Sequence, residues 1–217
     1  SRFGIDHYGA ISVNPKEAEN VSIAREVISG INEYLEHDRC VAMGEIGFNN
    51  INDREEQIFA EQLQIAHRKK MLAIVHLAHH NKVEAIKRTL SVIRNERFPE
   101  EKILIDHNDE ESMPFARESA CWTGMTVYPI SKLTPQRVSE IVKRFSPERM
   151  IIDGSADWGI SDPLSLVKTA EYMKNNGHND QTIKSILFDN PNRFYSQSFK
   201  WTPNFNIKPM DPKEFQR

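Results

Sequence analysis

The sequence has few cysteines and no long apolar run, and each absence excludes a class of protein. Only Cys40 and Cys121 occur in 217 residues, and neither has a second cysteine or a histidine at metal-ligand spacing. We therefore expect two reduced, buried thiols in a cytoplasmic protein rather than a disulfide-bonded scaffold. No apolar stretch approaches the roughly 20 residues that a membrane span needs, so we expect no membrane partner.

A strong excess of either charge is also lacking. The chain has 28 lysines and arginines against 31 aspartates and glutamates, which gives a net charge of −3. No long run of basic residues marks a nucleic-acid footprint, so nucleic acid stays open as a partner without being indicated. The composition, 39% hydrophobic and 27% charged, is typical of a globular domain. The partner we expect is a small-molecule substrate.

Short apolar runs alternate with helical patterns along the chain. The runs predict strands at Arg2–Val13, Cys40–Gly44, Leu72–Val75, Lys102–Ile105, Cys121–Val127 and Met150–Ile152. Apolar residues at helical spacing predict helices over residues 18–37, 53–70, 82–97, 110–119, 135–145, 164–176 and 180–189. Strands separated by helices predict a parallel sheet. We place the domain at residues 1–200 and expect residues 201–217 to form an extended tail.

Two architectures fit six such units, a doubly wound sheet and part of a (β/α)₈ barrel. No glycine-rich phosphate loop follows the first strand, which counts against a dinucleotide-binding sheet. We therefore predict an α/β fold of the (β/α)₈ TIM-barrel type, with six of the eight strand–helix units.

Side chains of the metal-ligand type stand where four apolar runs end. Glu45 and His76 directly follow their runs, His107 follows its run after Asp106, and Asp157 lies just beyond Met150–Ile152. The carboxyl ends of barrel strands form one ring, so these four side chains should converge. Both intervals, from Glu45 to His76 and from His76 to His107, are 31 positions. A barrel of about 250 residues with eight units also gives ~31 residues per unit.

Imidazole and carboxylate together suit zinc, manganese or iron, and magnesium also stays open. Such a divalent ion would polarise a substrate and lower the pKa of a bound water. Asp157 could take the proton of that water, with Asp153 as its rival. A lone histidine after a strand is usually a hydrogen-bonded loop residue, but three ligand-type residues at equal spacing favour a metal site.

Other polar residues near strand ends receive lesser roles. His79 and His80 are expected at a loop–helix junction and are left out of the site. Asp106 should point to the opposite side of its strand from His107 and make a structural hydrogen bond. Four residues are candidates for substrate contact: His7, Asn14, Tyr128 and Trp158.

Several short motifs, taken in order, resemble the TatD-related branch of the amidohydrolase superfamily. The resemblance runs from about Phe3 to Tyr195. The motifs are Asn14-Pro15-Lys16-Glu17, Gly44-Glu45-Ile46-Gly47, Val75-His76, Asp106-His107, Ser155-Ala156-Asp157-Trp158-Gly159 and Asp189-Asn190-Pro191.

The resemblance implies a two-metal barrel hydrolase. Glu45 would be the bridging glutamate, His76 and His107 would complete one metal site, and Asp157 would contact the other metal and handle the water proton. The family's first strand ends in His-x-His, which this sequence lacks. We therefore expect an N-terminally incomplete barrel with at most one tightly held ion. Its open strand edges should favour homo-oligomers.

Three functions follow from these observations. The first is a metal-dependent hydrolase that cleaves an ester, amide or phosphodiester. The second is a truncated barrel that binds metal or a partner without turnover, which the missing His-x-His favours. The third is a TatD-type deoxyribonuclease, which the net charge of −3 disfavours.

A substitution tests the role of Asp157. If its carboxylate is the general base, Asp157→Asn should leave metal binding largely intact and lower turnover by about 10²–10⁴-fold. Asp153→Asn, assayed on the same substrate, tests the rival. Unchanged turnover in Asp157→Asn would remove this residue from the mechanism.

Overall fold

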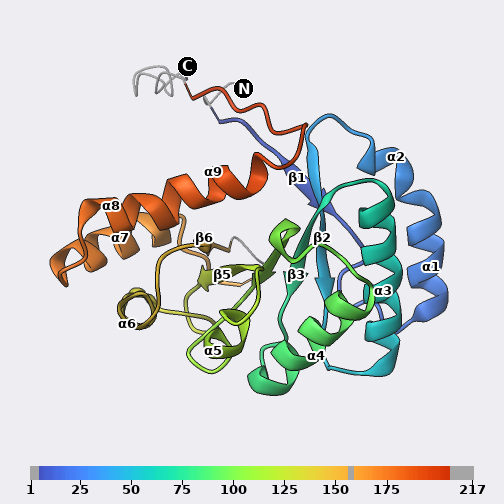
Figure 1. Cartoon of the computed structure of the whole chain (residues 1–217), viewed down its shortest axis with the longest axis horizontal. Helices are drawn as coiled ribbons and strands as arrows, with labels where there is room; N and C mark the ends of the chain where they lie inside the picture. The colour runs from blue at the N-terminus through green and yellow to red at the C-terminus, as the bar shows by residue number, and fades with distance from the viewer. Residues whose placement is uncertain (1–4, 156–158, 206–217) are drawn as a thin grey trace.

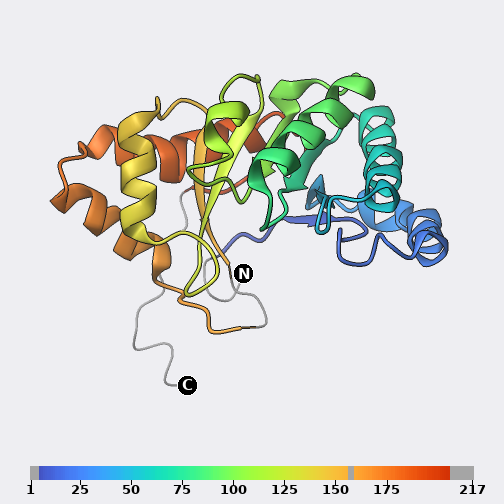
Figure 2. The same ribbon diagram turned by 90° about the horizontal axis from the view of Figure 1, so that it is seen from below.

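Six parallel strands form one sheet in the order β1-β2-β3-β4-β5-β6, curled into a half-barrel (Figures 1 and 2). The computed structural model describes residues 5–155 and 159–205. The strands are β1 (Gly9–Ile11), β2 (Cys40–Gly47), β3 (Leu72–His76), β4 (Ile103–Asp106), β5 (Trp122–Val127) and β6 (Met150–Gly154). Within the described residues β1 pairs only with β2 and β6 only with β5, so the sheet does not close.

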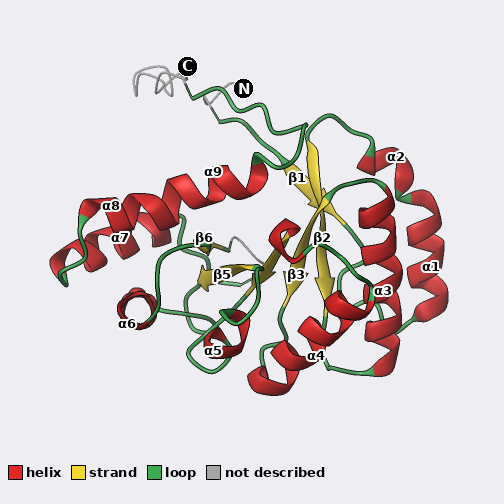
Figure 3. Cartoon of the chain, viewed as in Figure 1, coloured by secondary structure: helices red, strands yellow, loops and turns green. Residues whose placement is uncertain are grey.

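Helices connect successive strands, as parallel pairing requires, and flank the sheet (Figure 3). They are α1 (Val21–Gly30), α2 (Asn32–Leu35), α3 (Asp53–Arg68), α4 (Lys82–Asn95), α5 (Met113–Ala116), α6 (Pro135–Arg144), α7 (Ser165–Asn175) and α8 (Asp180–Lys184). A 3₁₀ turn (Glu100–Lys102) precedes β4, and a π-helical turn (Ser185–Asp189) joins α8 to α9 (Asn190–Tyr195).

Helix starts are set by side chains that accept the first free backbone N–H groups. The Asn52 side chain accepts hydrogen bonds from the backbone of Arg54 and Glu55, and the Glu55 carboxylate accepts one from the backbone of Asn52. This reciprocal capping box fixes where α3 begins. At the start of α6 the Thr134 hydroxyl accepts a hydrogen bond from the backbone of Arg137, and Pro135 occupies the first position, where no N–H is needed.

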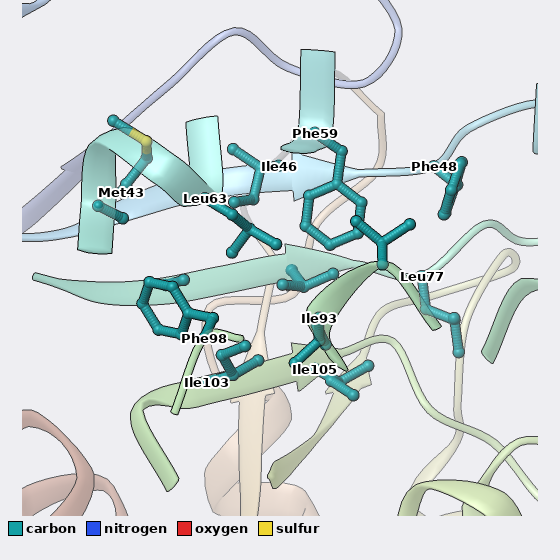
Figure 4. Close-up of a cluster of buried hydrophobic side chains, with 14 of the residues drawn as sticks. Met43, Ile46, Phe48, Phe59, Leu63, Leu77, Ile93, Phe98, Ile103 and Ile105 are labelled. Carbon is teal, nitrogen blue, oxygen red and sulfur yellow. The ribbon is translucent and has the colours of Figure 1, made fainter. Parts of the chain in front are cut away.

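The helix-covered face of the sheet carries the larger apolar core. Met43 and Ile46 of β2 pack with Phe59 and Leu63 of α3, and Ile105 of β4 continues the same layer (Figure 4). Each of these five side chains is at most 1% exposed. Burial of this kind supplies most of the free energy that holds the helices against the strands. A separate cluster holds α6 and α7 on β5 and β6.

The opposite face, inside the curl, is apolar near the start of the strands. Ala42, Leu72 and Leu104 alternate with the outward residues and pack around Phe194 of α9, which is fully buried. Trp201 extends this cluster, with its ring 4.5 Å from Tyr8 and 5.2 Å from Tyr195. The C-terminal segment therefore runs beside the segment that leads into β1 (Figure 1).

Most sequence expectations are confirmed, with differences at element ends. β1 has only three of the residues expected at Arg2–Val13, so His7, expected near the end of this strand, precedes it. The helix expected over 18–37 is divided into α1 and α2, and that over 110–119 shrinks to the four residues of α5. Both cysteines are free and buried, and burial raises the pKa of Cys121 to about 12.

Three expectations keep their status as predictions: homo-oligomerisation, the domain boundary at residue 200 and the cytoplasmic location. None of the helices in the described ranges is long and apolar enough to cross a membrane.

Replacing Phe194 with alanine should lower the free energy of unfolding by about 3–5 kcal/mol, because the change empties a fully buried position. Phe199→Ala is the matched control, since that ring is 81% exposed and its loss should cost less than about 0.5 kcal/mol. Urea unfolding of the two variants measures the difference. Equal midpoints would contradict the packing role of α9.

Candidate metal centre

Glu45, His76 and His107 converge at the carboxyl ends of β2, β3 and β4, as the spacing predicts. Each offers a ligand atom, and these atoms lie within 4.8 Å of one another. Nε2 of His107 is 3.0 Å from Oε1 of Glu45, and Nδ1 of His76 is 3.6 Å from Oε2. The two histidine rings are buried, while the Glu45 carboxylate is half-buried and faces a pocket. This is the geometry of a candidate metal centre.

The backbone at the end of β4 turns His107 toward this centre. His107 has φ of +64°, a left-handed conformation that ends the alternation of the strand. The buried ammonium of Lys82 donates a hydrogen bond to the carbonyl of His107 at 2.6 Å. The backbone N–H of His107 donates to Oδ1 of Asp106 at 2.7 Å. The expectation that Asp106 points away from His107 is therefore wrong, because the turn brings both side chains to one pocket. The expected hydrogen-bond role of Asp106 is confirmed.

A chain of hydrogen bonds fixes the ring of His107. Nδ1 lies 2.6 Å from the hydroxyl of Thr126, and that hydroxyl donates to Oδ1 of Asp106 at 3.2 Å. Since the hydroxyl proton goes to Asp106, Nδ1 of His107 carries the proton of this pair. The lone pair of Nε2 then faces the Glu45 carboxylate. Two acceptors in contact need a cation or a proton between them. In metal sites, a ligand histidine commonly donates the N–H of its other ring nitrogen to a neighbouring oxygen, as His107 does here.

His76 provides a second sign that a metal fits. Both of its ring nitrogens are buried, and neither has a hydrogen-bond partner. A buried polar nitrogen without a partner costs about 1–3 kcal/mol, so such atoms are normally satisfied. A cation held by His76, His107 and Glu45 would satisfy one of the two nitrogens. The donor set, two imidazoles and a carboxylate, suits a divalent transition metal.

The electrostatics of the centre follow from burial and close pairs. Burial alone would raise the pKa of Glu45, but its interactions with His107 and His76 outweigh burial and hold the pKa below the usual range. Burial lowers the pKa of His76, which favours the neutral, ligand-competent ring. Burial, followed by repulsion from Asp106, raises the pKa of Asp153 well above the usual value.

A pocket of about 500 Å³ opens over the centre. Its wall combines the three candidate ligands with residues of both charges. Beside Glu45, His76 and His107 the lining includes Asn14, Lys16, Glu17, His79, Asp106, Thr126, Lys132, Asp153 and Ser155. The pocket therefore offers several carboxyl groups and two ammonium groups to a substrate bound at the centre.

The structure places the other expected site residues in four different ways. Asn14 lines the pocket, and its contact with substrate stays a prediction. His7 is misplaced by the sequence argument, because it precedes β1 and lines a different pocket beside Arg39. Tyr128 is buried, and the described pocket wall does not include it. Asp157 and Trp158 lie outside the described residues, so their roles also stay predictions.

Sequence reasoning missed residues that hold or face the centre. Lys82 and Asn108 brace the turn at His107: Asn108 donates from its amide to the carbonyls of Ile105 and Gly124. Asp153 was not missed, since the sequence names it as the rival of Asp157; it lines the pocket although it sits within β6. His79 lines it too, and its position three residues after His76 was the available signal.

A family model described as TatD related DNase matches residues 1–196. The chain belongs to the TatD-related family. This TatD-related chain is 29% identical over 171 residues to an uncharacterized metal-dependent hydrolase of Methanocaldococcus jannaschii. That alignment covers 78% of this chain and 66% of the archaeal protein.

Solved structures agree on the barrel-type fold. A TatD-like protein of Archaeoglobus fulgidus matches this TatD-related chain with a TM-score of 0.66 and 25% identity, covering 87% of this chain and 72% of that one. A phosphotriesterase homology protein of Escherichia coli matches with a TM-score of 0.60 and 14% identity, and the match covers 72% of this chain and 60% of that one. The family resemblance and the TIM-barrel type of fold are thereby confirmed.

Thr126→Val should weaken zinc binding about 10–100-fold, because the hydroxyl that orients His107 is lost. Thr123→Val is the control: this threonine lies in the same strand and bonds the carbonyl of Arg149, away from the centre. Competition with a chromophoric chelator measures both affinities. Equal loss in the two variants would show a general effect on the strand.

Proposed function

We propose that this chain is a metal-dependent hydrolase whose divalent ion is held by Glu45, His76 and His107. The observation that carries the proposal is the pair of buried, unpartnered ring nitrogens of His76 beside the carboxylate of Glu45. The family and the archaeal relative support the same activity. The chain spans 66% of that relative's length, so the activity of the whole protein is part of the proposal.

The protein side of the mechanism is orientation and proton transfer. Thr126 and Asp106 hold the His107 ring, and Lys82 holds its backbone. A divalent ion bound there would act as a Lewis acid and lower the pKa of water to about 7. We assign the water proton to Asp157. Asp153, with its raised pKa, can carry a proton and is suited to protonate the leaving group.

A second candidate, cleavage of a phosphodiester in nucleic acid, is supported by one feature of the pocket. Lys16 and Lys132 both line it, and neither makes an ion pair with a carboxylate within the described residues. Their charge supplies locally what the net charge of −3 does not. A metal-binding barrel without turnover is the alternative that an assay must exclude.

Metal removal and substitution test the proposal together. Chelated protein should be inactive, and added zinc or manganese should restore hydrolysis of a nitrophenyl ester, bis-nitrophenyl phosphate or a DNA oligonucleotide. His76→Ala should lower the restored rate at least about 100-fold, because a ligand is lost. His80→Ala, in the loop that follows β3, should not change it.

Lys132→Gln separates the two substrate classes. It should weaken turnover of the phosphodiesters and leave the neutral ester unaffected. If zinc binds to the wild-type chain but no substrate in the panel is cleaved, the non-catalytic alternative replaces the proposal.

A further inference from the structure

A third histidine, His79, stands at the centre without an assigned role. It follows β3 by three residues and lines the same pocket as Glu45, His76 and His107. Its side chain is exposed on the pocket side, and its ring nitrogens make no hydrogen bond or ion pair with any described residue. Its neighbour His80 is also exposed but is not among the residues that line this pocket.

The three imidazoles are spaced like ligands of one ion. The ring centroids of His76 and His107 are 4.6 Å apart, those of His76 and His79 are 5.4 Å apart, and those of His79 and His107 are 5.6 Å apart. Rings that bind one ion through nitrogens at about 2.0–2.1 Å have centroids roughly 4.5–5.5 Å apart, depending on the angle. The His79 distances match this range or exceed it by a tenth of an ångström.

A rotation of the His79 side chain would be needed to complete the set. The ligand atoms that already lie within 4.8 Å of one another belong to Glu45, His76 and His107, and the ring of His79 is stacked against His107 at an interplanar angle of 30°. Rotating the His79 side chain breaks no hydrogen bond, and its exposure leaves room for the movement. The cost is therefore limited to part of the ring stacking and to side-chain entropy.

We propose that His79 is a fourth protein ligand of the ion at Glu45, His76 and His107, which gives a centre of three imidazoles and one carboxylate; this inference rests on the metal site of the proposed function. Three imidazoles suit zinc, iron or copper and disfavour magnesium, which prefers oxygen ligands. A four-residue set also supplies the four ligands that zinc usually takes in a tetrahedral site.

Zinc binding to the full chain tests this assignment, with His79→Ala compared against His80→Ala as the matched control. Zinc affinity, measured by competition with a chromophoric chelator, should fall at least about tenfold in His79→Ala and stay unchanged in His80→Ala. In ¹⁵N-histidine NMR of the wild-type chain, a ring nitrogen signal that is absent from His79→Ala should shift when zinc is added. A ring that only stacks on His107 would not show the large shift of a bound nitrogen.

The outcomes separate this inference from the metal site on which it rests. Unchanged zinc affinity in His79→Ala and an unmoved His79 ring nitrogen, together with loss of zinc from His76→Ala, would overturn the role of His79 and leave the site standing. Full zinc affinity in both His76→Ala and His79→Ala would overturn the site itself. His79→Gln keeps a polar side chain of similar length. It therefore controls for a loss of zinc affinity that comes from local unfolding in His79→Ala and not from the missing imidazole.

Discussion

The left-handed backbone at His107 is the constraint on which the rest of the centre depends. A strand that continued in the extended conformation would turn this ring to the opposite side from Asp106. At φ of +64° both side chains reach the pocket, and Asp106 can accept from the His107 N–H and from Thr126 at once. A non-glycine residue in this conformation is strained, so the surroundings must compensate. The Lys82 ammonium, bound to the His107 carbonyl, is one of the groups that do so.

One face of the sheet packs the apolar core, and the other face carries the candidate metal centre. The helix-covered face is mostly apolar, as the packing of Met43, Ile46 and Ile105 shows. The inner face is apolar only near the strand starts and carries His76, Asp106 and Thr126 near the strand ends. Gly124 belongs to this division, because a Cβ at that position would collide with the Asp106 carboxylate. Stability and reactivity can therefore change separately in this fold.

The elements and three of the site residues were predictable because they depend on local pattern. Apolar runs of four to eight residues and equal unit spacing were enough to place Glu45, His76 and His107 together. The ends of β1 and the direction of Asp106 were not predictable, because they depend on backbone torsions and hydrogen bonds between distant segments. His79 was set aside for a related reason: its sequence position indicates a loop, and only the spatial arrangement brings its ring within 5.6 Å of His107.

The contact between the two ends of the described chain has a consequence for how the protein folds during synthesis. The backbone N–H of Asn204 donates to the Asp6 carboxylate across 198 positions, and Trp201 packs against Tyr8. The segment that leads into β1 therefore gains these contacts only after residues 201–204 have left the ribosome. Until then the start of β1 lacks part of its packing, while β2 to β5 can already assemble with their own helices. Contacts of such long range make the last step slow, and the nascent chain is then most exposed to chaperones and proteases.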